Sequence, residues 1–370
     1  MADALGIYVH VPFCTRRCDY CAFATWDDRH HLWERYAAAC RAEAAELATG
    51  RWAGRGPASS VFFGGGTPSL LPGELLVSIL DAVRSAIRLE AGAEVTVECN
   101  PETLTASKLA AYRDAGVTRL SFGAQSMVPH VLASLGRAHD PGSVRRAAEL
   151  AGEAGFENAY NVDLIFGAAG ETLADWRRSL AEVLALSPPP SHVSAYALTV
   201  EPGTPLARFP ERHPDDDDQA SKYVLADALL SDHGLEWYEL SNWALPGKRC
   251  AHNILYWSQG DYAGLGCAAH SHRAAPDGTA RRWWNVRTPE RYCSLVEAGA
   301  AAEAAGEDLL VGDRRFESLV LSLRTSEGVP AGAVPAELFD EGLVRSSGER
   351  AVLTVRGRLL ANEVASRLRE

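Results

Sequence analysis

The chain has 370 residues, of which 47% are hydrophobic, and it carries a formal net charge of −12. This length and apolar content suit one large domain plus a smaller one, and they exclude wholesale disorder. The acidic balance disfavours nucleic-acid binding, which needs a basic surface for phosphates. We find no secretory signal and no run of 18 apolar residues. The eight cysteines are therefore expected in a reducing cytoplasm, where metal binding is commoner than disulfide formation.

In chain order, residues 1–200 alternate short apolar runs with amphipathic helical patterns. Repeated strand–helix units of this kind indicate a parallel sheet. Six such units are too few for a closed eight-unit barrel, which needs about 250 residues, so we predict an α/β fold with a partial (βα)6 barrel. The predicted strands are Gly6–Val11, Ser60–Phe63, Glu94–Cys99, Thr118–Gly123, Asn158–Ile165 and His192–Leu198. The predicted helices are Leu32–Ala48, Gly73–Leu89, Thr105–Ala115, Pro141–Ala154 and Leu173–Leu186.

Residues 201–312 form a second predicted region, which is irregular and rich in aromatic side chains. Its acidic run Asp215–Asp218 is predicted to start a helix over Gln219–Ser231, because carboxylates suit the positive end of the helix dipole. Residues 313–370 form a predicted winged-helix-like tail, so that the part after residue 200 is α+β. Because the tail has no clustered basic face, we expect it to serve in packing. Its predicted elements are helices over Phe316–Leu323, Val334–Asp340 and Val355–Leu368 and a hairpin around Ser346–Glu349.

Three cysteines follow the first predicted strand at a C-x3-C-x2-C spacing: Cys14, Cys18 and Cys21. Three thiolates are one ligand short of a closed tetrahedral zinc site or a fully ligated iron–sulfur cubane, so one metal position stays open. Structural zinc completed by His10 is the alternative, and the polar residues between the cysteines argue against three unconnected buried thiols. The favoured interpretation is an iron–sulfur cluster.

Further polar groups lie at the ends of the next predicted strands, where a parallel barrel gathers its functional residues. Glycines in Gly64–Pro68 let backbone approach a ligand closely, although a tight turn would use the same residues. A phosphate-binding loop is excluded because no Gly-Lys-Ser/Thr follows. Glu98 can accept hydrogen bonds from ribose hydroxyls or from an ammonium group, although a lone glutamate is more often solvated or salt-bridged. The planar fork of Arg137 suits a carboxylate.

The sequence Tyr-Val-His-x-Pro-Phe-Cys-x3-Cys-x-Tyr-Cys, which begins at Tyr8, resembles the radical SAM superfamily. Within it, the stretch is similar to the coproporphyrinogen oxidase family and its haem-chaperone (HemW-type) branch. The resemblance implies a partial barrel over most of residues 6–200. It also implies that the three cysteines hold three irons of a [4Fe-4S] cluster, whose fourth iron S-adenosylmethionine chelates. The implied S-adenosylmethionine contacts are Tyr8, Tyr20, Gly65, Gly66, Thr67, Glu98, Gln125, Arg137 and Asp163.

The sequence departs from this family pattern after Asp163. The family continues Gly-Leu-Pro-Gly-Gln-Thr, whereas residues 167–172 read Gly-Ala-Ala-Gly-Glu-Thr. The shape of this loop is therefore left open, while the assignment of Asp163 is kept.

A second informative motif is His252-Asn253-x-x-Tyr256-Trp257, which resembles the HNxxYW motif of the haem-chaperone branch. The resemblance implies that these four residues contact haem, because a histidine can ligate haem iron and aromatic rings stack on a macrocycle. Cys250 is a second candidate for the iron ligand. The alternative is that His252 and Asn253 hydrogen-bond a loop, while Tyr256 and Trp257 fill a domain interface.

Three functions are compatible with these motifs: a haem chaperone, an oxygen-independent coproporphyrinogen III oxidase, and a nucleic-acid-modifying radical SAM enzyme. The oxidase family carries a fourth cysteine where this chain has Phe23, and an N-terminal extension where only seven residues precede Tyr8. The HNxxYW motif belongs to the chaperone branch, and the acidic balance disfavours the third function. We therefore predict a cytoplasmic haem chaperone that passes haem to an unidentified acceptor protein. A membrane-associated acceptor, a homodimer and radical turnover are left open, and no catalytic residue is assigned.

Overall fold

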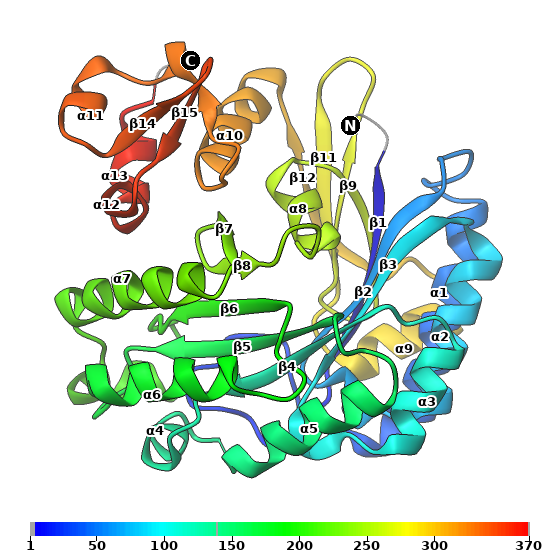
Figure 1. Cartoon of the computed structure of the whole chain (residues 1–370). Coiled ribbons are helices and arrows are strands. Elements are labelled where there is room, and N and C mark those ends of the chain that lie inside the picture. The colour runs from blue at the N-terminus through cyan, green and yellow to red at the C-terminus, as the bar shows by residue number, and fades with distance from the viewer. Residues whose placement is uncertain (1–3, 138–139, 369–370) are drawn as a thin grey trace.

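The computed structural model describes residues 4–137 and 140–368 (Figure 1). Its main feature is a twelve-stranded sheet in the order β12-β11-β10-β9-β1-β2-β3-β4-β5-β6-β8-β7. Strands β1 to β6 pair in parallel, each with the next along the chain, which confirms the predicted α/β fold and its strand–helix units. They span Leu5–Val11, Ala58–Gly65, Leu89–Cys99, Arg119–Gln125, Tyr160–Phe166 and His192–Ala197.

Helices between these strands cover the outer side of the sheet (Figure 1). They bury apolar stripes, as α2 shows with Leu76, Ile79, Leu80 and Val83 fully enclosed. The short helix α4 was not predicted, because six residues hold too few helical turns to show a periodicity. The helices are α1 (Trp33–Ala45), α2 (Gly73–Ala86), α3 (Ala106–Asp114), α4 (Pro129–Ser134), α5 (Pro141–Glu153), α6 (Leu173–Leu184) and α7 (Asp216–Asp232).

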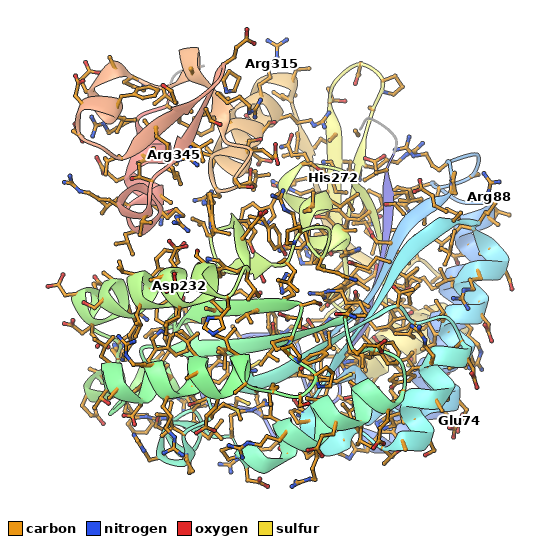
Figure 2. The ribbon with its side chains drawn as sticks, viewed as in Figure 1. Glu74, Arg88, Asp232, His272, Arg315 and Arg345 are labelled. Atoms are coloured by element: carbon orange, nitrogen blue, oxygen red, sulfur yellow. The ribbon has the colours of Figure 1, made fainter. Side chains whose placement is uncertain are left out.

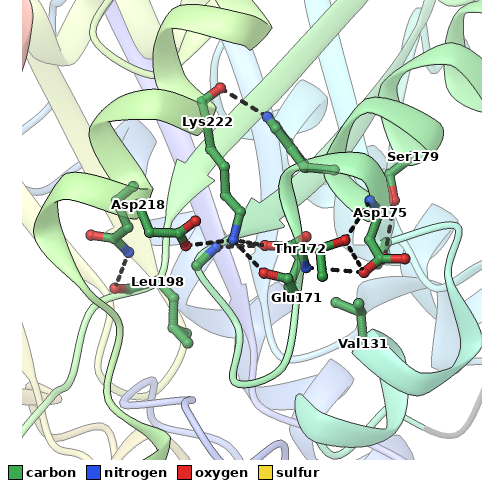
Figure 3. A network of polar contacts seen from close by, with 12 residues as sticks. Val131, Glu171, Thr172, Asp175, Ser179, Leu198, Asp218 and Lys222 are labelled. Atoms are coloured by element: carbon green, nitrogen blue, oxygen red, sulfur yellow. Dashed lines mark hydrogen bonds and ion pairs between the residues drawn. The ribbon is translucent and has the colours of Figure 1, made fainter.

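The acidic run does begin α7, where the side chain of Asp215 accepts a hydrogen bond from the backbone nitrogen of Asp218. Asp218 also meets a buried cation, since its Oδ2 lies 2.6 Å from Nζ of the fully buried Lys222 (Figure 3). The same Nζ lies 3.2 Å from Glu171 Oε2, and Glu171 in turn accepts from the backbone nitrogen of Gly167 at 2.7 Å. A buried ammonium needs such partners. This network fixes the loop over residues 167–172, whose shape the sequence left open.

The chain after residue 200 extends both edges of the same sheet. Strand β8 (Asn242–Ala244) pairs antiparallel with β6, and β7 (Glu236–Glu239) pairs antiparallel with β8 at the outer edge. At the other edge β9 (Asp261–Leu265) pairs in parallel with β1, and β10 (His270–Ala274), β11 (Ala280–Asn285) and β12 (Glu303–Leu309) follow antiparallel. Helices α8 (Ala251–Trp257) and α9 (Pro289–Glu297) connect these strands. The predicted division at residue 200 stays a prediction, and its outer limits, residues 1 and 370, lie outside the described residues.

The tail forms a three-stranded sheet, β13-β15-β14, with a core of its own. The predicted hairpin is present between β14 and β15, but the prediction of one final helix is wrong: the helix breaks at Leu360, where ψ is 26°. The break turns the chain so that Ala361 and Val364 reach the buried core. The winged-helix comparison stays a prediction. The tail elements are α10 (Val311–Leu323), β13 (Val329–Pro330), α11 (Ala336–Asp340), β14 (Val344–Ser347), β15 (Arg350–Leu353), α12 (Val355–Leu359) and α13 (Ala361–Ser366).

Along the described parts of the chain, no helix combines the length and apolar character needed to cross a lipid bilayer.

A buried carboxylate joins α1 to the β9–β12 side of the sheet. Glu43 accepts hydrogen bonds from the Gly266 backbone nitrogen, the Tyr292 hydroxyl and the Asn285 amide, each at 2.7 Å. Burial raises the pKa of Glu43 to about 7. Three donors from three separate segments converge on the carboxylate of Glu43. This side chain therefore fixes how strands β9–β12, which we call the β9–β12 extension, are placed against the barrel.

We expect Glu43→Ala to lower the free energy of unfolding by about 3 kcal/mol, because three buried donors lose their acceptor. Urea denaturation followed by circular dichroism measures this loss. Glu46→Ala, an exposed position one turn further along the chain, is the matched control and should change stability by less than about 0.5 kcal/mol. An equal loss in both variants would show that Glu43 has no special role in this joint.

Candidate functional site

A cavity of about 430 Å³ opens at the carboxyl ends of the parallel strands. We call it the first cavity. The loop after β1 lines it, together with the ends of β2 to β6, as expected for a parallel α/β barrel. The three cysteines and eight of the nine predicted S-adenosylmethionine contacts line this one space. These eight are Tyr20, Gly65, Gly66, Thr67, Glu98, Gln125, Arg137 and Asp163.

The cysteine loop is closed at its base by backbone hydrogen bonds. Trp26 donates to the Pro12 carbonyl at 2.8 Å, and Cys14 donates to the Trp26 carbonyl at 3.0 Å. This closure holds Cys14, Cys18 and Cys21 against the ends of β2 and β4. A cubane places each thiolate on a different iron, so its ligands surround a cluster. The three cysteines line one cavity, as the ligands of a single cluster would, and the cluster stays a prediction.

The alternative, a mononuclear zinc site, needs a fourth ligand besides the three cysteines. In the described ranges 4–137 and 140–368, no three side chains among His, Cys, Asp and Glu are placed to share one metal ion. His10, the predicted fourth zinc ligand, has both ring nitrogens engaged. Nδ1 accepts from the Tyr8 hydroxyl at 3.0 Å, and Nε2 donates to the Ala24 carbonyl at 2.9 Å. Burial also lowers the pKa of His10 to about 4.

Two opposing effects act on the pKa of the Cys14 thiol. Burial raises the pKa of Cys14 to about 11 and also raises the pKa of Cys21. The Thr67 hydroxyl, whose Oγ1 lies 3.9 Å from Cys14 Sγ, acts against burial and lowers the pKa of Cys14. Arg137 Nη1 lies 3.4 Å from Cys18 Sγ. Metal ligands must be deprotonated, so cluster assembly would release protons from these sites.

The glycine run after β2 packs directly against the cysteine loop. A β carbon on Gly66 would lie 2.7 Å from the Phe13 carbonyl oxygen and 3.1 Å from Cys14 Sγ, so a larger residue does not fit. Gly65 has a φ of 115°, which glycine alone adopts without strain. The Gly65 backbone nitrogen donates to Glu98 Oε2 at 3.0 Å. The run therefore serves both as a tight turn and as part of the cavity wall.

The remaining polar residues are each held in place by a neighbour. Arg137 Nη2 donates to Asn100 Oδ1 at 2.9 Å and to the Gly123 carbonyl at 2.8 Å. Asp163 accepts from the Ser121 hydroxyl at 2.8 Å. Gln125 has a positive φ of 63°, which is uncommon outside glycine and often marks a functional position. Burial, followed by the charge of Asp163, raises the pKa of Glu98 to about 7.

Sequence reasoning missed several residues that line the same cavity. Asn100 and Ser121 orient Arg137 and Asp163, as described above, and Tyr196 and Thr199 come from the end of β6 and the loop after it. Asn100 carries a usable signal, since it lies two residues after Glu98 in the same strand end. The others have no distinctive neighbours in the sequence.

Tyr8 is the exception among the predicted S-adenosylmethionine contacts. Its hydroxyl binds His10, and it lines a second cavity of about 850 Å³. This second cavity lies between β9–β11, helices α8 and α10, and residues 22–24 of the cysteine loop. Tyr8 and His10 alternate with Ile7 and Val9 along β1, and the latter two enter the hydrophobic core. Tyr8 and His10 therefore lie on the side of β1 opposite to Ile7 and Val9, where both line the second cavity.

The HNxxYW residues lie at α8, and the side chains of His252 and Asn253 form hydrogen bonds to strands β2 and β7 and within α8. His252 is buried, and its two ring nitrogens are hydrogen-bonded to the hydroxyls of Ser60 at 2.8 Å and Tyr256 at 2.9 Å. Burial lowers its pKa to about 3. The Asn253 amide donates to Glu239 Oε1 at 3.1 Å. Of the four motif residues, Tyr256 lines the second cavity. The haem contacts assigned to His252, Asn253, Tyr256 and Trp257 stay predictions.

Cys250 precedes α8 and is also engaged. Its thiol donates to Glu94 Oε1 at 3.3 Å, and burial raises its pKa to about 12. The other oxygen of Glu94 accepts from the backbone nitrogen of Ala251 at 3.0 Å, at the helix start. Cys250 therefore helps to dock α8 onto β3.

Comparisons with known proteins agree with this geometry. The model of the radical SAM superfamily matches residues 8–183. The chain is 43% identical to the heme chaperone HemW of Mycobacterium tuberculosis (strain ATCC 25618 / H37Rv) over 378 residues, which covers 98% of this chain and 94% of that protein. It is 36% identical to the heme chaperone HemW of Escherichia coli (strain K12), which covers 88% and 84% of the two chains.

Among solved structures, the coproporphyrinogen III oxidase HemN from Escherichia coli, a radical SAM enzyme, is similar with a TM-score of 0.81. The alignment covers 99% of this chain and 90% of that chain at 23% identity, so it supports the fold.

We expect Cys14→Ser, Cys18→Ser and Cys21→Ser each to lose most of the iron that the reconstituted protein binds, because two thiolates cannot hold the cluster. Anaerobic iron and sulfide analysis with visible absorbance measures this loss. Cys293→Ser, a buried cysteine on α9 away from the cavity, should keep full iron content. Full iron content in all three loop variants would contradict the assignment.

We expect the affinity for S-adenosylmethionine to fall about tenfold from pH 8 to pH 6, because the pKa of Glu98 is about 7 and its protonation removes an acceptor from the cavity. Anaerobic equilibrium dialysis measures the affinity. Glu98→Gln should bind weakly with little dependence on pH, whereas Glu201→Gln, on the exposed rim of the same cavity, should keep the wild-type profile. A pH profile that survives in Glu98→Gln would assign the titration to another group.

Proposed function

This chain belongs to the radical SAM superfamily and, within it, to the family of the heme chaperone HemW proteins, and from that membership we propose that it binds haem and delivers it to an acceptor protein. The observation that carries the proposal is an identity of 43% that extends over 98% of this chain, well beyond the superfamily match over residues 8–183. The tail and the β9–β12 extension are thus included in the likeness.

We propose that Cys14, Cys18 and Cys21 hold a [4Fe-4S] cluster and that the first cavity holds S-adenosylmethionine. When bound, the cluster supplies an open iron position and an electron donor for S-adenosylmethionine. The guanidinium of Arg137 offers a fork for the methionine carboxylate, while its other contacts keep it in place. The carboxylate of Glu98 is the acceptor for the ammonium or ribose groups.

Phe23 supports a chaperone over an oxidase that would use a fourth cysteine at this position. Its side chain is 66% exposed and lines both cavities. An exposed aromatic ring of this kind is suited to an apolar ligand. We further propose that the chain acts in the cytoplasm, that the acceptor of the haem is a separate protein, and that the chain associates into dimers.

The test is one anaerobic preparation of the cluster-loaded chain, supplied in parallel with haem and with coproporphyrinogen III plus S-adenosylmethionine and a reductant. We expect a stable complex of about one haem per chain, followed by absorbance, and no decarboxylated product by mass spectrometry. Haem-free myoglobin as a trap then reports whether the bound haem can be passed on. Efficient conversion to protoporphyrinogen without a haem complex would assign the chain to the oxidase function.

A further inference from the structure

We propose that haem, the cargo in the proposed function, binds in the second cavity, with His270 as the ligand of its iron. This inference rests on the proposed function and names the site that function would use. It places the iron away from His252, whose ring nitrogens are both engaged within the protein.

The size and walls of the second cavity suit a flat macrocycle. Its volume of about 850 Å³ lies within the range of about 300–1,000 Å³ that small-molecule and cofactor sites occupy. Tyr256 and Tyr262 meet edge to face, with ring centroids 4.7 Å apart and planes at 86°. Aromatic rings supply the apolar contact that a porphyrin needs. The aromatic residues of the wall are Tyr8, Phe23, Tyr256, Tyr262 and Trp284.

Three histidines line this cavity, and their hydrogen bonds separate them. His10 has no free ring nitrogen, as described above. His272, which Figure 2 labels, is 4% exposed. Its Nδ1 donates to the Gly260 carbonyl at 3.1 Å. Its Nε2 is enclosed and has no hydrogen-bond partner among the described residues. An unpaired buried nitrogen is uncommon in folded proteins, and here it belongs to a side chain in the wall of the cavity. His272 therefore presents no accessible ring nitrogen to a metal in the cavity.

His270 is the histidine that a metal can reach. It lies on β10 two residues before His272, so both side chains point to the same face of the sheet. Within the described parts of the chain, neither ring nitrogen of His270 has a hydrogen-bond partner, and the residue is exposed at the cavity. Its ring stacks on Trp284, with centroids 5.5 Å apart and planes at 26°. This stacking orients the imidazole without using its nitrogens.

The chemistry of the ring agrees with this role. Burial, followed by the charge of Arg282, lowers the pKa of His270, so the ring is neutral at physiological pH. A neutral imidazole is the form that ligates iron. The geometry carries the assignment, and the protonation state is consistent with it.

Among the described residues that line the cavity, one cation is free to meet the propionate groups of haem. Arg282 is committed, since Nη2 lies 2.9 Å from Glu317 Oε1 and Nε lies 2.8 Å from Glu307 Oε1. Arg287 lines the cavity, is exposed, and has no ion pair within the described ranges. A guanidinium recognises a carboxylate through paired hydrogen bonds. Arg287 is therefore assigned to a propionate.

The test titrates the cluster-loaded chain anaerobically with haem and, separately, with iron-free protoporphyrin IX. We expect His270→Ala to weaken haem binding by at least about tenfold and to shift the Soret band, because the iron ligand is lost. Its affinity for protoporphyrin IX should not change, and added imidazole should restore the wild-type spectrum. His233→Ala, at the far end of α7, is the matched control with unchanged binding. Thermal melting and iron content show whether each variant folds.

A second pair of variants tests the cavity without touching the iron ligand. Arg287→Glu should weaken the binding of haem and of protoporphyrin IX alike, since both carry propionates, whereas Arg345→Glu on the exposed tail should not. The proposal that haem binds in the second cavity is overturned if His270→Ala and Arg287→Glu both bind haem as the wild type does. It is also overturned if His252→Ala alone loses the Soret band. A wild-type chain that binds no haem would refute the proposed function itself, which separates the two failures.

Discussion

Strand β1 is the element on which the rest of the structure depends. It pairs in parallel with β2 on one side and with β9 on the other, although β9 lies some 250 residues further along the chain. The parallel register sends the chain from β1 into the cysteine loop at the same edge where β2 to β6 end. It also places β9 to β12 beside that loop, where they form the wall of the second cavity. One fully paired strand thus sets the positions of both cavities.

Two carboxylates with similar pKa values, Glu43 and Glu98, differ in role: the first joins parts of the fold, and the second lines the proposed ligand site. Burial raises the pKa of both Glu43 and Glu98 to about 7. Glu43 accepts three hydrogen bonds from protein groups, which uses most of the capacity of a carboxylate. Glu98 accepts one from Gly65 and faces a cavity. The perturbed pKa is common to both residues, and the unused acceptor capacity distinguishes the one at the ligand site.

The sequence predicts the parallel half of the fold well because each strand there is a short apolar run between helical patterns. It does not predict β9 to β12, since β12 is mostly exposed and β10 carries His270, His272 and Arg273, a polar pattern that is atypical of a strand. The pairing of β9 with β1, which anchors these strands, is a long-range contact with no local signal. The spacing of the cysteines predicts a metal site, because metal ligation fixes both residue type and separation, and this assignment stays a prediction. The eight predicted residues that line the first cavity are implied by the family resemblance, and most of them lie at strand ends that share one edge.

The second cavity shows that a sequence motif alone does not identify a metal ligand. A histidine in a motif is expected to be the ligand, yet the capacity of a histidine to ligate depends on what its nitrogens already bind. His252 holds Ser60 and Tyr256, and its motif thereby fixes α8 against β2. That helix in turn contributes Tyr256 and Gln259 to the cavity. The motif is therefore connected to the second cavity through the placement of α8, and Tyr256 is the motif residue that lines it.

Ala22 and Phe23 line both cavities, so a single short segment separates them. This segment belongs to the cysteine loop, and the loop is held at its base by Pro12, Cys14 and Trp26. Ligation of Cys21 would restrict the chain immediately before Ala22. In the proposed function, binding of the cluster on one side therefore orders the partition that the cargo contacts on the other. A cysteine at position 23 would replace the apolar ring of this partition with a thiol, and the two cavities would no longer be separated by an aromatic side chain.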